Sequence, residues 1–392
     1  MYFVQFYHNE TLMWDRKTEV TTFKNGFSSV WNRCEKLGKI IWVNAQSKKS
    51  ETFDYPCKTA YVSVYYKNEL FKVIKWAKEN PGIHFHIGGP IVDTWTLSKK
   101  LEGPIPNLTS HPKVLIEELL FNERVAPLDD WNLKIPSDIK TKHIFYNFSI
   151  AKKNGCWWRR CKYCKQKSVP IYINYKHIPV IDFNATKHIW INSYCIRPRD
   201  LTKIYSNLPN RKDVRYSTYL KLTEPSIRSL HEALAINRIE PRNLAFNVGI
   251  ECASDRLLSI FDRGVTLNEY INGMNFLLRL GCKVHINLIF RLGILKESDI
   301  RDTRRFVHSL MGNDLSNLSA SIYRLHISKE RPLWKYLVNK RVPLKPTYSH
   351  VWDSDIYNVK CNKNQMALEN EMLSIYKNMN MNYLWNTIPE GE

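Results

Sequence analysis

The chain has 392 residues, of which 44% are hydrophobic, and its 58 Lys and Arg against 37 Asp and Glu give a formal net charge of +21 at pH 7. This length excludes a short peptide and allows either two domains with cores of their own or one large barrel. No apolar stretch is long enough to cross a bilayer, and the first residues lack the pattern of a secretory signal, so we expect a cytoplasmic protein with no membrane partner.

The strong positive charge has two interpretations. It would attract a polyanion such as RNA or DNA. Alternatively, the basic residues cover the whole surface as a solubility feature, which fits the absence of any basic block longer than a few residues. Composition alone favours neither interpretation.

The first hundred residues alternate short apolar runs with amphipathic stretches. Strands are expected at 2–7, 39–43, 60–66 and 83–87, and helices at 27–37 and 69–78. This alternation predicts an open, Rossmann-like α/β sheet of parallel strands. Gly88-Gly89-Pro90 follows the last of these strands, where such sheets bind ligands, although a tight turn without a ligand is the commoner meaning of this tripeptide.

Residues 101–143 contain five prolines and little periodicity, which predicts a linker. The alternation then resumes, with strands expected at 144–150, 188–192, 214–221, 244–250, 283–290 and 319–326. Helices are expected at 198–205, 224–235, 253–261, 267–280 and 297–310. Six strands with helices between them predict a partial, TIM-like (β/α)6 barrel over 144–335. Residues 336–392 are expected to form a C-terminal extension with weak helical periodicity at 365–378.

Cysteine usage singles out one loop. The nine cysteines are too few and too unevenly spread for a disulfide framework, and six of them lie singly in apolar surroundings that suggest packing. The other three, Cys156, Cys161 and Cys164, lie within nine residues in the stretch NGCWWRRCKYCK. Three converging thiolates hold a soft metal or an iron–sulfur cluster, and a four-position centre then keeps one position open for another ligand.

This loop follows the first expected barrel strand and resembles the cysteine loop of the radical S-adenosylmethionine (SAM) superfamily. Its spacing, C-x4-C-x2-C, is one residue longer than the usual C-x3-C-x2-C and matches a branch with the form GC-x-W-x-x-C-x-F-C, in which Tyr163 takes the aromatic place. The resemblance implies that Cys156, Cys161 and Cys164 ligate a [4Fe-4S] cluster whose open iron binds SAM. It also implies reductive cleavage of SAM to a 5′-deoxyadenosyl radical, with electrons from a flavodoxin-type or ferredoxin-type partner.

Two later segments, 247–266 and 286–303, resemble the family's fourth and fifth strands with the helices that follow them. Arg291 stands where the family has glycine, and the Pro-Gly pair that usually follows is missing, so the resemblance implies a divergent member. For Glu251, capping of the helix expected at 253 is the alternative to a SAM contact. The resemblance implies SAM contacts by Tyr163, Asn192, Ser193, Lys221, Glu251 and Asn287.

The N-terminal sheet resembles the cobalamin-binding domain that precedes the barrel in one branch of the superfamily. The usual cobalt-ligating signature, D-x-H-x-x-G, is absent from residues 1–60. The resemblance therefore implies a cobalamin-binding-like domain over residues 1–100, either with cobalamin held without a histidine ligand or with the cofactor lost.

Three readings of the cysteine loop remain open. The first is a catalytic cluster that modifies a substrate, for instance by methylation or another C–H functionalisation. The second is a zinc site of Cys156, Cys161, Cys164 and His177 in a basic nucleic-acid-binding protein. The third is a degenerate relative that no longer cleaves SAM. RNA or DNA is a candidate substrate, since Trp157 and Trp158 beside Arg159 would suit stacking, although aromatic residues also shield clusters.

Overall fold

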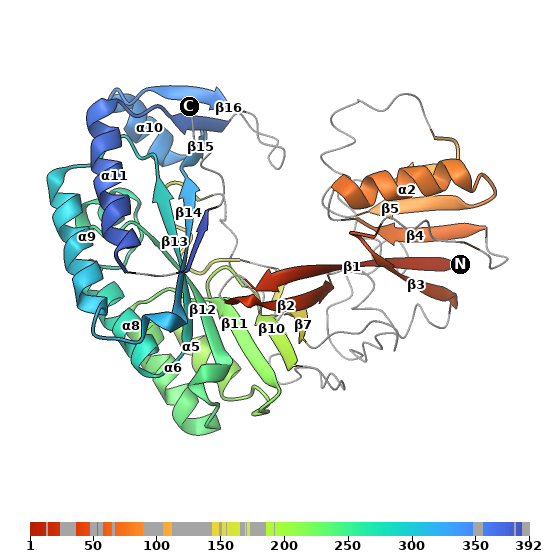
Figure 1. Ribbon diagram of the computed structural model, residues 1–392, viewed down its shortest axis with the longest axis horizontal. Coiled ribbons are helices and arrows are strands. Elements are labelled where there is room, and N and C mark those ends of the chain that lie inside the picture. The colour runs from red at the N-terminus through yellow and green to blue at the C-terminus, as the bar shows by residue number, and fades with distance from the viewer. Residues whose placement is uncertain are drawn as a thin grey trace. The chain divides into compact units, whose positions relative to one another are not determined.

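The computed structural model of the protein shows an α/β chain in which two compact units are distinguished (Figure 1). The first unit comprises Met1–Leu12, Lys17–Phe148 and His177–Trp190, and the second Met13–Arg16, Ser149–Lys176 and Ile191–Glu392. The structure describes residues 1–12, 15–23, 37–47, 53, 58–64, 67–88, 92, 105–111, 143–148, 151–153, 155–164, 169, 171–172, 186–191, 193–347, 356–379 and 382–385. The predicted α/β class is confirmed, and none of the helices described in these ranges is long and apolar enough to span a membrane.

The first unit contains the parallel sheet that the N-terminal alternation predicts. Its strands run in the order β3 (Lys39–Asn44), β1 (Tyr2–Leu12), β4 (Thr59–Ser63), β5 (His84–Gly88) and β6 (Leu108–Ser110), and every neighbouring pair is parallel. A further strand, β2 (Asp15–Phe23), pairs in parallel with β7 (His143–Phe148). Gly88 ends β5, whereas Gly89, Pro90 and most of the helix expected at 27–37 lie outside the described residues.

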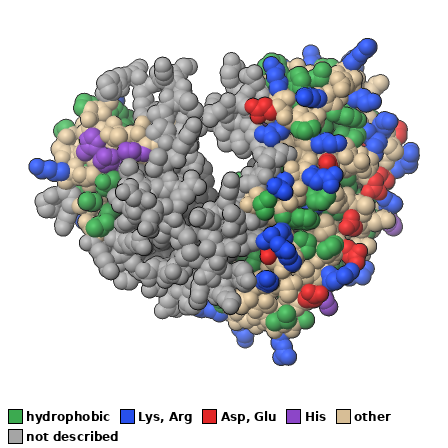
Figure 2. Space-filling view, turned by 180° about the vertical axis from the view of Figure 1, so that it is seen from behind, with side chains coloured by type: hydrophobic (Ala, Val, Ile, Leu, Met, Phe, Trp, Pro, Cys, Tyr) green, Lys and Arg blue, Asp and Glu red, His purple; other side chains and the backbone are tan. Residues whose placement is uncertain are grey.

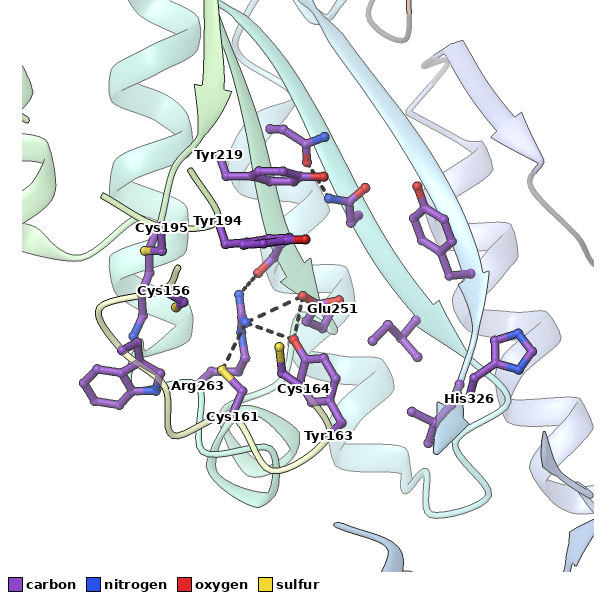
Figure 3. Close-up of a pocket in the computed structure, with 18 of the residues that line it drawn as sticks. Cys156, Cys161, Tyr163, Cys164, Tyr194, Cys195, Tyr219, Glu251, Arg263 and His326 are labelled. Carbon is purple, nitrogen blue, oxygen red and sulfur yellow. Dashed lines mark hydrogen bonds and ion pairs between the residues drawn. The ribbon is translucent and has the colours of Figure 1, made fainter. Parts of the chain in front are cut away.

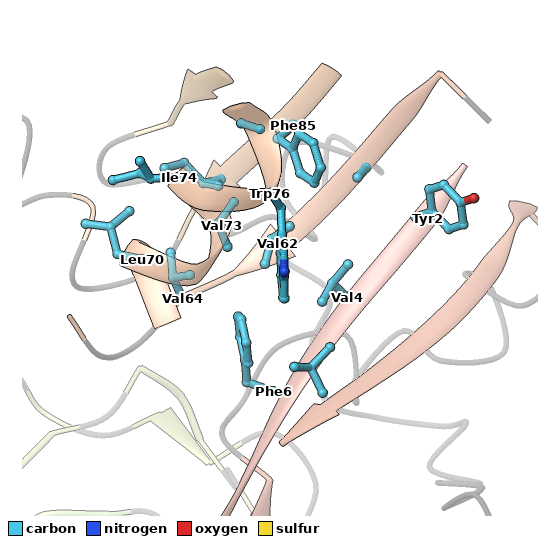
Figure 4. Packing of buried hydrophobic residues seen from close by; sticks show 14 of the residues in the cluster. Tyr2, Val4, Phe6, Val62, Val64, Leu70, Val73, Ile74, Trp76 and Phe85 are labelled. Atoms are coloured by element: carbon cyan, nitrogen blue, oxygen red, sulfur yellow. The ribbon is translucent and has the colours of Figure 1, made fainter. Parts of the chain in front are cut away.

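One face of this sheet packs against helix α2 (Lys67–Glu79) (Figure 4). Tyr2, Val4 and Phe6 alternate along β1, so their side chains all lie on the face that α2 covers. The Phe6 and Trp76 rings stack with centroids 5.7 Å apart. Each large side chain buried in this way stabilises the fold by about 1.5–3 kcal/mol relative to an exposed one.

Half-buried histidines gather at the edge of the same sheet, where Figure 2 shows their side chains together. The His84 and His86 ring centroids are 4.8 Å apart, and His86 Nδ1 lies 3.0 Å from His111 Nε2. Burial lowers the pKa of His86, and repulsion by His84 and His111 lowers it further. Near neutral pH the lowered pKa therefore favours the uncharged form of His86.

The second unit is built on five parallel strands in the order β11 (Val214–Tyr219), β12 (Leu244–Glu251), β13 (Lys283–Phe290), β14 (Leu318–Arg324) and β18 (Asn382–Trp385). Helices α5 (Pro198–Tyr205), α6 (Glu224–Asn237), α7 (Asp255–Ile260), α8 (Leu267–Arg279) and α9 (Glu297–Leu310) lie between the strands. The other two expected barrel strands are also present, as β7 and β10 (Thr186–Ile191), and they belong almost entirely to the first unit.

The C-terminal region has more structure than its weak periodicity indicates. It adds α10 (Pro332–Asn339), α11 (Lys363–Lys377) and strand β18, which extends the parallel sheet beyond β14. A small antiparallel sheet joins β15 (His326–Ser328), β17 (Ile356–Val359) and β16 (Leu344–Thr347), and β8 (Ala151–Lys153) pairs with β9 (Ile171–Tyr172). Two 3-10 turns, Pro241–Asn243 and Leu315–Asn317, lead into β12 and β14.

The segment between β12 and α8 is fixed at both ends by helix caps. Ser254 Oγ accepts a hydrogen bond from the Leu257 N–H at 3.4 Å and starts α7. A capping box starts α8, in which Glu269 N–H donates to Thr266 Oγ1 at 3.2 Å and Thr266 N–H donates to Glu269 Oε2 at 2.8 Å. The two caps fix the backbone positions between which Arg263 lies.

Candidate functional site

A cavity of about 560 Å³ opens within the second unit, at the carboxyl ends of β11, β12, β13 and β14 (Figure 3). In parallel α/β folds this is the end of the sheet where ligands bind. Seven of the residues predicted to ligate the cluster or contact SAM line the cavity: Cys156, Cys161, Tyr163, Cys164, Lys221, Glu251 and Asn287. Ser193 is buried and is not among the lining residues, and Asn192 lies outside the described part of the chain.

The cysteine loop is attached to two neighbouring segments of the second unit. Trp157 N–H donates to the Cys195 carbonyl at 3.4 Å, and Lys162 N–H donates to the Phe261 carbonyl at 2.9 Å. Arg159, in the part of the loop that contains the additional residue, has a left-handed φ of 57°. The longer spacing is thus accommodated by one strained residue, and all three cysteines still reach the cavity.

The Trp158 side chain packs against Asp262 and Gly264, in the segment between α7 and α8. Its indole Nε1 donates to the Asp262 carbonyl at 2.7 Å. Gly264, with φ of 58°, packs so closely against the indole that an added Cβ would lie 1.9 Å from Trp158 Cζ2. Only glycine meets both the conformational and the steric demand at this position.

The surroundings of Cys156 favour its ionised form, and a cation lies beside Cys161. A hydrogen bond from the Cys195 side chain is the main cause that lowers the pKa of Cys156 to about 6, and Lys221 adds to the effect. Arg263 Nη1 donates to Cys161 Sγ at 3.4 Å. Thiolates beside cations are what an iron–sulfur cluster requires.

The residues present fit such a cluster by their donor chemistry. Among the described residues, no three His, Cys, Asp or Glu side chains are already grouped tightly enough to hold a metal ion. Nevertheless, three cysteines of one loop line the same cavity, and the cations Arg263 and Lys221 lie beside them to offset thiolate charge. His177, the fourth ligand of the zinc alternative, lies outside the described residues.

Arg263 links the cysteine loop to the end of β12, and the sequence analysis did not identify it. Its Nη1 donates to Tyr163 Oη at 2.9 Å and lies 3.6 Å from Glu251 Oε1, while its Nη2 donates to the Gly249 carbonyl. Tyr163 Oη in turn donates to Glu251 Oε1 at 2.8 Å. The signal available in the sequence was its place beside Gly264, inside a segment that already resembled the family.

One side-chain oxygen of Glu251, Oε1, takes part in this network. Burial raises its pKa, and the charge of Arg263 and the hydrogen bond from Tyr163 partly oppose that rise. The alternative role as a helix cap is not observed, because α7 begins at Asp255 and its N-cap is Ser254. The strand also ends irregularly, since Glu251 has φ of 63° and the pairing with β13 shifts register between Gly249 and Glu251.

Lys221 presents a buried ammonium group to the cavity. Its Nζ lies 3.3 Å from the centre of the Trp158 ring, and within the described part of the chain it has no hydrogen-bond partner. Burial lowers its pKa to about 8. A buried cation without an acceptor is costly, so this position suits an anionic group of a bound ligand.

The loop after β13 is built differently from the glycine-containing loop of the family, as its sequence indicates. Arg291, where the family has glycine, adopts the left-handed φ of 61° that glycine would favour. Helix α11 supports the loop, because Glu369 Oε1 accepts from Leu292 N–H at 2.9 Å and Gln365 pairs with both Leu295 N–H and the Leu295 carbonyl. Arg291 Nη1 also lies 3.5 Å from Glu369 Oε2.

Comparison with known proteins finds similar folds among solved structures and no match by sequence. No family model and no curated protein matches the sequence. Among solved structures, the cobalamin-dependent SAM radical enzyme OxsB aligns over 95% of this chain and 65% of its own, with 13% identity and a TM-score of 0.59. The radical SAM methyltransferase TsrM from Kitasatospora setae aligns over 95% and 90%, with 9% identity and a TM-score of 0.52. The chain thus spans less than two thirds of the OxsB chain.

Proposed function

Because the chain has the fold of the cobalamin-dependent radical SAM enzymes, we propose that it is itself an enzyme of this kind. It would bind a [4Fe-4S] cluster and SAM, and it would cleave SAM reductively to modify a substrate. The observation that carries the proposal is the convergence of Cys156, Cys161 and Cys164 with Glu251 and Lys221 in one cavity. Without that convergence the three thiols would indicate only a soft-metal site.

The residues of the cavity have distinct roles in this proposal. The three cysteines would hold the cluster as thiolates, and the hydrogen bond from Arg263 to Cys161 would offset their charge. A cluster held there would supply the one-electron reduction that cleaves the S–C5′ bond of SAM. The ammonium of Lys221 pairs with the SAM carboxylate, which would satisfy a group otherwise buried without a partner.

Glu251 has the chemistry to contact the ribose or the amine of SAM. A carboxylate accepts hydrogen bonds from hydroxyls and pairs with an ammonium group. Tyr163 and Arg263 bond to Glu251 Oε1, which fixes the orientation of the carboxylate before any ligand arrives. Asn287, Asn192 and Ser193 remain predicted SAM contacts in the proposal.

The partners follow from the chemistry. Reduction requires a one-electron donor of the flavodoxin or ferredoxin type, and RNA or DNA is the proposed substrate, with methylation or another C–H functionalisation as the outcome.

OxsB is described as cobalamin-dependent, and TsrM as a methyltransferase solved with cobalamin and a [4Fe-4S] cluster bound. Cobalamin binding by the first unit is proposed on the parallel sheet of that unit, although a histidine ligand motif is absent from residues 1–60.

Anaerobic reconstitution with iron and sulfide tests the proposal. We expect a brown protein with about four irons per chain, which forms 5′-deoxyadenosine from SAM when dithionite is added. Cys161→Ala should lose the iron and the activity. Cys282→Ala is the matched control, because this cysteine is fully buried and does not line the cavity, and it should retain both.

Other outcomes separate the competing readings. A colourless protein with one zinc per chain would contradict the proposal and favour the zinc site. An intact cluster that never yields 5′-deoxyadenosine would instead favour a relative that keeps the cluster without cleaving SAM. Repeating the assay with cobalamin, and with RNA or DNA present, measures whether either changes the rate or the product.

A further inference from the structure

Part of the cavity is lined by aromatic rings that the proposed cluster and SAM contacts do not use. Tyr194 and Tyr219 stack with ring centroids 6.3 Å apart and an angle of 20° between the planes, and Figure 3 shows the two rings lying one above the other. Tyr323, on β14, lines the same cavity. Burial raises the pKa of Tyr219 to about 12, with Tyr323 and Tyr194 contributing, so the three phenol groups lie close together.

Tyr194 is the accessible member of this group. Its side chain is 54% exposed although it is large and largely apolar. An exposed aromatic ring stacked on a half-buried one presents a flat surface to the cavity. A planar ligand ring would gain about 1–3 kcal/mol by stacking on such a surface.

The polar groups around these rings suit an uncharged or anionic ligand. The buried Nε of Arg324 and the buried Oδ1 of Asn287 have no hydrogen-bond partner among the described residues. Glu251 is the only carboxylate among the described residues of the lining; its Oε1 is engaged by Tyr163 and Arg263, and the proposed function assigns the rest of the carboxylate to SAM. A ligand ammonium group would therefore lack a free counter-ion, whereas a phosphate would find a guanidinium.

Resting on the proposed function, we propose that the substrate is a nucleotide, free or within a strand, whose base stacks on Tyr194 and whose phosphate pairs with Arg324. All four bases offer a flat π-face, and their edges carry N–H donors for an acceptor such as Asn287 Oδ1. Guanidinium groups bind phosphate through two parallel hydrogen bonds. An aromatic amino acid fits less well, because its ammonium group would compete for the single engaged carboxylate.

Binding without turnover tests this inference. The reconstituted protein is saturated with SAM, no reductant is added, and AMP, GMP, CMP, UMP, adenosine and tryptophan are titrated by calorimetry. We expect at least one nucleotide to bind more tightly than its nucleoside and than tryptophan, without displacing SAM. Tyr194→Leu should weaken nucleotide binding about tenfold or more, and Tyr194→Phe, which keeps the ring, should weaken it little.

The phosphate contact has its own variant. Arg324→Gln should weaken AMP binding about tenfold and leave adenosine binding unchanged. Arg228→Gln is the matched control, because Arg228 is exposed on α6, pairs only with the exposed Glu224 among the described residues, and should change neither. Single-stranded oligonucleotides of RNA and DNA form the second arm, and binding tighter than that of the mononucleotide would identify a strand as the source.

Several results would overturn the inference. Tryptophan binding as tightly as AMP would do so, as would nucleotides that displace SAM or a Tyr194→Leu variant that loses SAM affinity instead. These results are distinguishable from failure of the proposed function. A protein that binds AMP through Tyr194 but forms no 5′-deoxyadenosine would contradict SAM cleavage alone. A protein that forms 5′-deoxyadenosine but does not bind AMP would contradict only the nucleotide substrate.

Discussion

At the scale of single residues, the cysteine loop depends on a few close contacts. Trp158 contacts both the Lys221 ammonium and Gly264, and its indole N–H is satisfied by the Asp262 carbonyl. The ring therefore touches both a buried cation and the segment that carries Arg263. Any change that moves this ring alters the surroundings of both cations next to the thiols.

The contact between Gly264 and Trp158 can be measured by comparing alanine substitutions at two glycines of the second unit. Gly264→Ala should destabilise the protein by about 3 kcal/mol, because alanine both strains the left-handed backbone and collides with Trp158. Gly281→Ala should cost about 1 kcal/mol, since Gly281 has φ of 80° but an added Cβ would meet nothing within 4 Å. Urea unfolding of both variants gives the comparison, and equal losses would show that the ring moves aside freely.

At the scale of elements, buried polar side chains connect neighbouring strands and helices. On β13, His285 lies two residues before Asn287 and therefore on the same face of the strand. Its Nδ1 lies 2.8 Å from Ser319 Oγ and its Nε2 2.9 Å from Ser321 Oγ, both on β14. Burial lowers the pKa of this imidazole to about 4, so the strand pair accommodates it uncharged.

The stability of the second unit should therefore fall in acid. Between pH 6.5 and about 4 the unfolded chain takes up a proton at His285 that the folded chain excludes, so the free energy of unfolding decreases as the pH falls. The loss from this group is roughly 3 kcal/mol and is complete below pH 4. His285→Gln should show a shallower slope in chemical unfolding followed from pH 7 to 4. An unchanged slope would mean that this imidazole is protonated as readily in the folded chain.

Sequence patterns predicted local features well and long-range contacts poorly. Apolar runs such as 283–290 marked buried strands, and the three cysteines marked the site, because both signals lie within a few neighbouring residues. Arg263 reaches Cys161 across 102 positions and Gln365 reaches Leu295 across 70, and periodicity carries no information about such pairs. Cys195 likewise resembled a packing residue, yet its backbone pairs with that of Cys156 in an isolated parallel β-bridge, and it lines the cavity.

At the scale of the whole molecule, the chain carries a net charge of +21, and on the face that Figure 2 shows the described Lys and Arg side chains do not gather in one patch. There the described Lys and Arg side chains are interspersed with Asp and Glu over the second unit. Such a surface attracts a polyanion at long range without fixing where it binds. The cavity rather than the surface would then determine where the polyanion binds.

The salt dependence of binding tests this division. If a strand makes about three phosphate contacts, its affinity should fall roughly tenfold or more between 50 and 200 mM salt. Arg324→Gln should reduce the slope of log affinity against log salt by about 0.7, the share of a single contact. Retention that does not change with salt would exclude a polyanionic partner.

The contact between Leu292 and Glu369 has a consequence for the order of assembly. The Leu292 N–H obtains its partner only after 77 more residues have been synthesised, because the carboxylate belongs to α11. Asn287 and Ile289, which line the cavity, lie just before this loop. While the ribosome is still making α11, that wall of the cavity lacks its support, so we expect cofactor insertion to follow translation rather than accompany it.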